Sequence, residues 1–220
     1  MRTIRVTGKG QIKVNPDMTR ITITLEGMYP DYAETLKHSS EDTDSLKDVL
    51  AAFGFERTDL KTLSFNVDTE YESYKDHDTY KQRFVGYRFR HLLKVEFDSD
   101  NERLGKTLFA LVNCDLNPEF RISYTVKDLE SAKNELLGKA IKDAKEKAAV
   151  LTSAGGVTLK DIQSIDYSWG EIEFEVSPIN RLMKACAPVP DACEDACYDM
   201  DIEPDDIDVS DTVTVVWEIA

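Results

Sequence analysis

The sequence predicts an α+β fold in which helices pack on one face of a largely antiparallel sheet. Two kinds of periodicity predict it. In several stretches apolar and polar residues alternate, which is typical of a half-buried strand, and in three others apolar residues recur every three to four positions, which is typical of a helix. The expected order is β-β-α-β-β-α-β-α-β-β, and strands that follow each other in pairs favour antiparallel pairing.

The first strand pattern, over 3–14, places apolar residues and glycines at even positions and polar residues at odd ones. Gly8 and Gly10 therefore fall on the buried face. The third glycine of a phosphate loop is missing, and another strand follows instead of a helix, so we interpret both glycines as room for a bulky neighbour or for a bend. A turn at 15–17 then predicts a hairpin between 3–14 and the next strand, 18–28.

Three helices are expected. Asp31 with Glu34, and Ser99 with Glu102, have the spacing of a capping box and predict where the first two begin. The longest helix should cover 129–154. Its apolar stripe is mostly alanine, which predicts close packing on a sheet, and the two glycines that follow are expected to end it.

Two long strands are expected at 60–74 and 83–97. His91 falls on the apolar face of the second strand, where we interpret it as a hydrogen-bonded core residue and not as a ligand or a base. Acids on the polar face of the first of these strands and arginines on the polar face of the second predict cross-strand ion pairs. Each pair should stabilise the fold by no more than about 1 kcal/mol. The residues concerned are Glu70, Glu72, Arg88 and Arg90.

The remaining strands are expected at 120–126, 165–176 and 207–219, with a bulge near 170–171 where the apolar parity changes. Residues 178–206 form an acidic excursion that contains cysteines and prolines. We expect one domain over 1–220 that carries this excursion.

The charge of the chain is strongly acidic. Among 220 residues, 42 Asp and Glu against 27 Lys and Arg give a net charge of −15, and no Lys or Arg follows Lys184. Nucleic-acid binding needs clustered basic residues, so we expect none. No apolar run approaches the roughly 20 residues of a membrane span, and the first residues lack the apolar stretch of a signal peptide. We therefore expect a cytoplasmic location, with an exported precursor as the alternative.

The four cysteines divide into two groups. Cys114 ends an apolar helical pattern and is expected to be a buried small hydrophobe. Cys186, Cys193 and Cys197 are separated by six and three residues, a spacing that zinc sites seldom use, so they are weak metal candidates. We expect no metal and no cofactor, and we keep a metal- or redox-responsive protein built on these three cysteines as an alternative.

Four segments in the same order carry a resemblance to a known family. They are Val6-Thr7-Gly8-Lys9-Gly10 with the turn Asn15-Pro16-Asp17; Lys61 to Val67 followed by Gly86-Tyr87-Arg88; the strand 120–126 with the alanine-rich helix and Ala154-Gly155-Gly156-Val157; and Ile202-Glu203-Pro204 before the last strand. The chain resembles the SIMPL-domain family, which includes bacterial periplasmic immunogenic and oxidative-stress-associated proteins. The resemblance implies an α+β fold and assembly into homo-oligomers, and it implies no catalytic residue.

We therefore expect a non-enzymatic scaffold or binding protein that self-associates, of unknown physiological role, with a link to stress response. The expected partners are further copies of the chain and a protein partner. No catalytic residue is expected, because the three histidines are scattered and suggest no nucleophile–base pair. A hydrolase with an unrecognised carboxylate site remains a further alternative, although exposed acids are usually only solvated.

Overall fold

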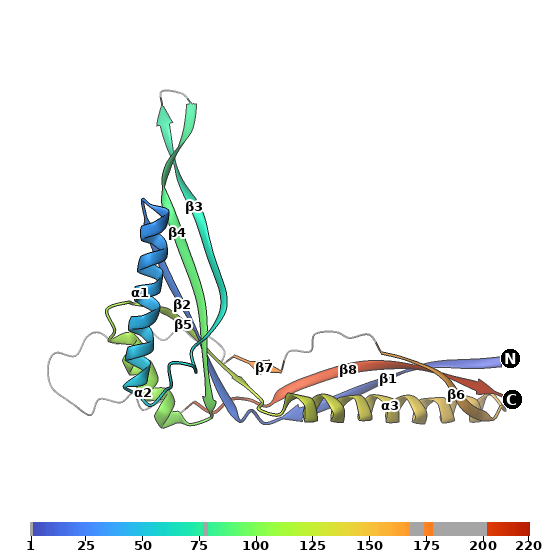
Figure 1. The fold of residues 1–220 in the computed structure, drawn as a ribbon. Coiled ribbons are helices and arrows are strands. Elements are labelled where there is room, and N and C mark those ends of the chain that lie inside the picture. Colours follow the sequence, from blue (N-terminus) through green and yellow to red (C-terminus); the bar gives the residue numbers. More distant parts are fainter. Residues whose placement is uncertain (1, 77–78, 168–173, 178–201) are drawn as a thin grey trace. The chain divides into compact units, whose positions relative to one another are not determined.

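The computed structural model describes residues 2–76, 79–167, 174–177 and 202–220 (Figure 1). Its helices and antiparallel sheets confirm the α+β class and the expected order of elements. The chain divides into two compact units. The first comprises Met1–Asp17, Thr125–Val176 and Pro204–Ala220, and the second comprises Met18–Tyr124 and Ser177–Glu203. The single domain expected over 1–220 stays a prediction.

The first unit contains a three-stranded sheet with the order β1-β8-β6 and one long helix. β1 (Arg2–Val14) pairs with β8 (Ile207–Ile219) in an unbroken antiparallel register, and β6 (Leu159–Asp166) pairs with the other side of β8. Helix α3 (Leu129–Ala154) runs along one face of β1 and β8 (Figure 1). The two-residue strand β7 (Glu175–Val176) also belongs to this unit.

The glycines of β1 allow α3 to approach the sheet at backbone distance. A Cβ atom on Gly8 would lie well under 3.0 Å from the Ala140 carbonyl oxygen, and one on Gly10 equally close to the Leu136 carbonyl oxygen. The buried stripe of α3 is Ala132, Leu136, Ala140, Ala144, Ala148 and Thr152. The expected close packing is confirmed, and the neighbour that needs the room is the helix backbone.

The prediction of a hairpin between the first two strands is wrong. β1 pairs with β8, while the second strand lies in the other sheet. The intervening turn bonds elsewhere: the Asp17 N–H donates to the Thr125 carbonyl (3.2 Å), and the Asp17 carboxylate accepts from the Lys127 N–H (2.8 Å). A turn signal reports a change of chain direction and does not choose the partner of a strand.

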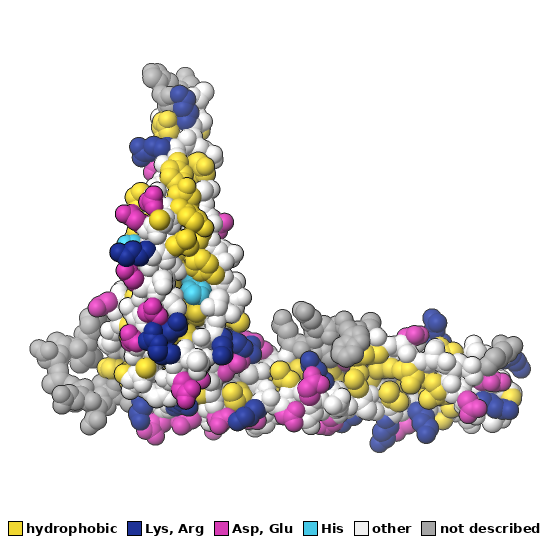
Figure 2. All heavy atoms as spheres, viewed as in Figure 1, with side chains coloured by type: hydrophobic (Ala, Val, Ile, Leu, Met, Phe, Trp, Pro, Cys, Tyr) yellow, Lys and Arg dark blue, Asp and Glu magenta, His cyan; other side chains and the backbone are white. Residues whose placement is uncertain are grey.

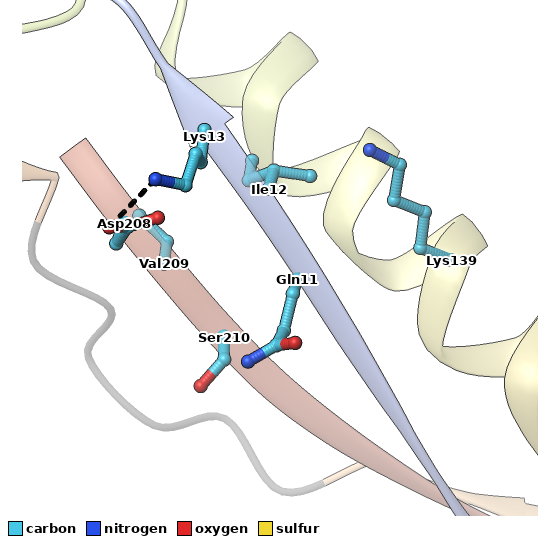
Figure 3. Close-up of a pocket in the computed structure, with 7 residues that line it drawn as sticks. All are labelled: Gln11, Ile12, Lys13, Lys139, Asp208, Val209 and Ser210. Atoms are coloured by element: carbon cyan, nitrogen blue, oxygen red, sulfur yellow. Dashed lines mark ion pairs between the residues drawn. The ribbon is translucent and has the colours of Figure 1, made fainter. Parts of the chain in front are cut away.

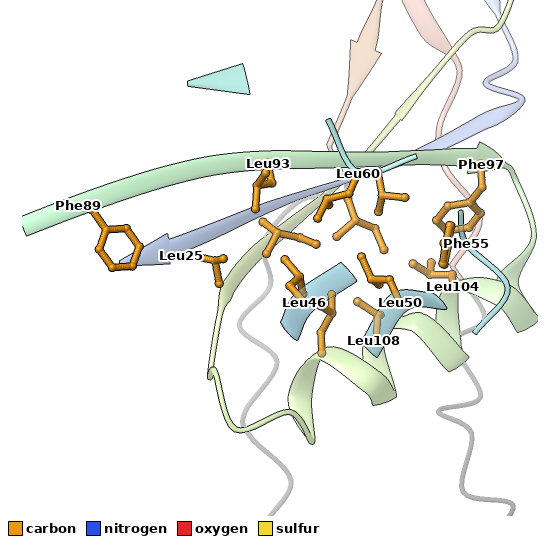
Figure 4. Packing of buried hydrophobic residues seen from close by; sticks show 14 residues of the cluster. Leu25, Leu46, Leu50, Phe55, Leu60, Phe89, Leu93, Phe97, Leu104 and Leu108 are labelled. Carbon is orange, nitrogen blue, oxygen red and sulfur yellow. The ribbon is translucent and has the colours of Figure 1, made fainter. Parts of the chain in front are cut away.

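The second unit holds strands in the order β3-β4-β2-β5. These are β3 (Lys61–Asp76), β4 (Thr79–Asp98), β2 (Met18–Tyr29) and β5 (Glu119–Thr125). Helices α1 (Tyr32–Ala51) and α2 (Asn101–Val112) bury their apolar sides in one cluster with this sheet. Figure 4 shows leucines of both helices pointing toward Leu93 and Phe97 of β4.

Several expected boundaries need correction. Asp31 caps α1 as expected, but Asp100, not Ser99, caps α2, because its carboxylate accepts from the N–H groups of Glu102 and Arg103. The polar stretch between the two long strands is itself strand, except for residues 77–78, which lie outside the described residues. The strand expected at 165–176 begins earlier, as β6, and the bulge near 170–171 lies outside the described residues.

Candidate functional site

A groove runs between α1 and β3 in the second unit. α1 packs on β2 and β4, and β3 lies beyond the helix at the edge of the sheet. The groove has a volume of about 330 Å³. Its lining residues are Leu36, Ser39, Ser40, Thr43, Asp44 and Lys47 from α1, Phe65 from β3 and His91 from β4. Polar side chains therefore come mainly from the helix, and the ring of Phe65 supplies the strand side.

His91 at the base of this groove is hydrogen-bonded through both ring nitrogens, which confirms the prediction of a hydrogen-bonded core residue. The Thr43 hydroxyl donates to the Ser39 carbonyl (2.7 Å), so it accepts from Nδ1–H of His91 (3.1 Å). Nε2 then accepts from the Thr62 hydroxyl (2.9 Å). Burial, followed by the charge of Lys47, lowers the pKa of His91 below 6.5, and the neutral ring is favoured.

The rim of the groove is apolar and exposed. Phe65 is 40% exposed and contacts His91 edge-on, and Tyr71, 54% exposed, contacts Phe84 in the same way. Phe84 in turn contacts Tyr87, which contacts Tyr32 of α1. Figure 2 shows hydrophobic side chains as a stripe along the β3–β4 hairpin. Exposed apolar surface of this continuity is typical of an interaction site.

The opposite face of this sheet carries charge. Arg88 pairs with Glu70 at 2.8 Å and Arg90 with Glu26 at 2.8 Å, so the expected cross-strand ion pairs are present with partly different partners. Glu72 pairs with Arg83 instead. The expectation placed the acids of β3 opposite Arg88 and Arg90, whereas a register shift between Glu70 and Tyr71 moves Glu72 opposite Arg83.

Two further cavities are more polar. In the first unit, a cavity of about 500 Å³ is lined by residues of β1, β8 and α3, and Lys13 and Asp208 form an ion pair of 3.5 Å at its side (Figure 3). In the second unit, Asp42 and Glu26 line a cavity of about 190 Å³. Burial raises the pKa of Asp42, but Glu26 is held by two arginines.

The cysteine candidates remain untested by the structure. Cys186, Cys193 and Cys197 lie outside the described residues. Cys114 is only partly buried, and its thiol donates to the Leu111 carbonyl (3.1 Å). Within the described parts of the chain, no cluster of three or more His, Cys, Asp or Glu side chains is arranged to hold a metal ion.

Sequence reasoning missed most residues of the groove. Thr43 and Thr62 hold the ring of His91, yet serines and threonines on a helix or strand give no signal of their own. The one available signal was the place of His91 among the apolar residues of its strand, which predicted a core position. The exposure of Phe65 and Leu36 was also unforeseen, because both continue the apolar pattern of their elements.

Comparisons with known proteins agree with the resemblance. Residues 4–217 match the SIMPL family model, described as a protein of unknown function (DUF541). The chain is 25% identical to the 26 kDa periplasmic immunogenic protein of Brucella melitensis over 209 residues, which are 90% of this chain and 82% of the relative. The protein of the same name from Brucella abortus is 24% identical over the same shares.

These names correct one expectation. Both relatives are named as periplasmic, which contradicts the cytoplasmic location expected from the first residues of the chain. An export signal is removed from a mature protein, so the first residues of a sequence are a weak guide to location. Among the described residues, none of the helices has the length and apolar character needed to cross a membrane. Because the family model covers nearly its whole length, the chain belongs to the SIMPL family of proteins of unknown function.

Proposed function

We propose that the protein is a non-enzymatic, self-associating scaffold or binding protein that acts in an exported location. The observation that carries the self-association is an exposed apolar surface among the described residues of the first unit. Ile162 and Ile165 of β6 are about half exposed, and α3 exposes Val150 and Leu151. The exported location is supported by the names of the two Brucella relatives.

The geometry of β6 supports association through side chains. Ile162 and Ile165 pair with Trp217 and Val215, which are buried on the α3 side of the sheet, so both isoleucines point to that side. Two register shifts leave only residues 164–166 of β6 in consecutive register, a stretch too short for the addition of a further strand. Association should therefore depend on these apolar side chains and not on backbone pairing along β6.

The link to stress response stays a prediction. The metal- or redox-responsive alternative also stays a prediction, since its cysteines lie outside the described residues. The hydrolase alternative also stays a prediction. Asp42, the acid with a raised pKa, lines the same cavity as Glu26, which is ion-paired with Arg88 and Arg90. We assign no catalytic residue.

Size exclusion with multi-angle light scattering tests the proposal directly. The protein is measured over a roughly hundredfold range of concentration, with and without reductant. We expect an oligomer that persists in reductant, and we expect Ile165→Lys to shift it toward monomer, because a lysine in the interface would be desolvated. Ser164→Lys, on the opposite face of the same strand, should leave the mass unchanged.

Circular dichroism of each variant shows whether the fold is intact. A wild-type monomer at all concentrations would contradict self-association. An oligomer that both lysine variants leave intact would place the interface elsewhere. An oligomer that dissociates in reductant would direct attention to the cysteines.

A further inference from the structure

We propose that the edge of β3 and the adjoining α1–β3 groove bind an extended peptide segment of a partner protein, in which apolar residues alternate with Lys or Arg. The segment would add to the sheet as a strand beside β3. This proposal specifies a partner for the binding role, and it does not depend on self-association, because it uses residues of the second unit alone.

β3 offers a long open edge. It stands first in the strand order and pairs with β4 along its whole length, and no strand lies on its other side among the described residues. Edge strands are usually protected by proline, by short length or by lysine in their middle. β3 is 16 residues long, contains no proline, and has lysines only near its ends, at Lys61 and Lys75. Between its two register shifts, residues 64–70 are regular.

The groove would receive every second side chain of the added strand. Phe65 and Val67 of β3 pair with His91 and Phe89, which are buried toward α1, so the odd positions of β3 face the groove. A strand beside β3 would place alternate side chains on the same face, next to Phe65 and Leu36. These two side chains are 40% and 38% exposed, and apolar side chains of the partner would cover them.

The other face of the added strand would meet acidic residues. Asp68 and Glu70 lie on the even face of β3. Glu70 is paired with Arg88, whereas Asp68 has no ion pair among the described residues. Lys or Arg at alternate positions of the partner would lie on this even face and be complementary to Asp68 and Glu70.

The same charges disfavour a second copy of β3 as the occupant. If two β3 strands paired antiparallel with their groove faces on the same side, Asp68, Glu70 and Glu72 of both copies would share the other face. Like charges on neighbouring strands destabilise the pairing. The partner that the surface favours is therefore a basic, alternating segment from a different protein.

Fluorescence anisotropy with synthetic peptides tests the proposal. The probe is a labelled peptide of alternating Val and Lys, roughly eight residues long to match a typical strand. One control peptide has the same composition with all Val before all Lys, and another has the same sequence with N-methylated internal residues, which cannot donate backbone hydrogen bonds. The protein variants are Asp68→Lys and Phe65→Ala, with Asp115→Lys as an exposed charge control elsewhere in the unit.

We expect the alternating peptide to bind, and both control peptides to bind at least about tenfold more weakly. Asp68→Lys and Phe65→Ala should each weaken binding by a similar factor, whereas Asp115→Lys should have little effect. Asp68 is exposed, so its variant keeps the test valid even if Phe65→Ala is poorly folded. Hydrogen exchange should slow at the amides of 64–70 when the peptide is bound.

Three results would overturn the proposal. The first is no binding of the alternating peptide at millimolar concentration, and the second is equal binding of the block or N-methylated peptide, which would indicate attraction by net charge alone. The third is a fall in the bound fraction of the peptide as the protein concentration rises, which would show that a second copy covers the edge. Because Ile165→Lys changes only the first unit, that variant should bind the peptide normally whether or not self-association is confirmed.

Discussion

The two units pack helix against sheet with opposite kinds of side chain. In the first unit, glycines of β1 face alanines of α3, and the two backbones come close. In the second unit, leucines and phenylalanines of both helices and the sheet interlock, with Leu46, Phe89 and Leu104 entirely buried. The first arrangement depends on the absence of side-chain atoms and the second on their presence. Substitutions that add or remove methylene groups should therefore act differently in the two units.

The largest expected effect is the loss of a large side chain from the second unit. Leu46→Ala should lower the free energy of unfolding by about 3 kcal/mol, because Leu46 is fully buried and its removal leaves a cavity. Leu36→Ala on the same helix should cost less than about 1 kcal/mol, since Leu36 is 38% exposed. Urea unfolding followed by circular dichroism measures both. Equal losses would show that the second core does not depend on Leu46 more than on the groove rim.

A smaller but still large effect is expected from adding one methyl group to the first unit. Gly8→Ala should lower the free energy of unfolding by about 2 kcal/mol, because its Cβ would collide with the backbone of α3. Gly138→Ala, within α3 and with nothing near the added atom, should instead stabilise by up to about 1 kcal/mol. If Gly8→Ala were neutral in the same unfolding assay, α3 would not lie as close to β1 as described.

The smallest expected effect is a pH dependence of the second unit. The pKa of His91 is lower in the folded protein than in the unfolded chain, so the unfolded state binds the proton more readily. The stability that the neutral ring contributes is complete above pH 6.5 and falls as the pH drops below that value. His91→Gln should remove this component, which comparison of unfolding curves between pH 5 and 8 would measure. A control with His38→Gln, on the exposed side of α1, should keep it.

If the wild type and His91→Gln lost stability in parallel as the pH fell, the titrating group would lie elsewhere. Asp42, whose pKa is raised by burial, would not explain such a loss, because a raised carboxyl pKa favours the folded state at low pH.

Much of the fold was predictable, because periodicity reports which face of an element is buried. The alternation in 3–14 and 207–219 gave strands close to β1 and β8, and the alanine stripe gave α3 and its contact with a sheet. Strand partners were not predictable in the same way. β1 and β2 carry equivalent patterns, and nothing in either states that the first pairs with β8, nearly two hundred residues away.

The sequence by itself determined the α+β class, the buried face of β1, β2, β4 and β8, the cap at Asp31 and the place of His91 on an apolar face. Only the tertiary structure decided that β1 and β2 belong to different sheets, that Thr43 and Thr62 hold the imidazole, and that α1 leaves Phe65 uncovered at an open edge. The physical reason is that a local pattern of apolar and polar residues reports which side of a helix or strand is buried. Sheet edges and grooves depend instead on which elements pack against each other, and that is set by contacts between residues far apart in the sequence. The candidate binding surface at β3 and α1 was therefore found only in the tertiary structure.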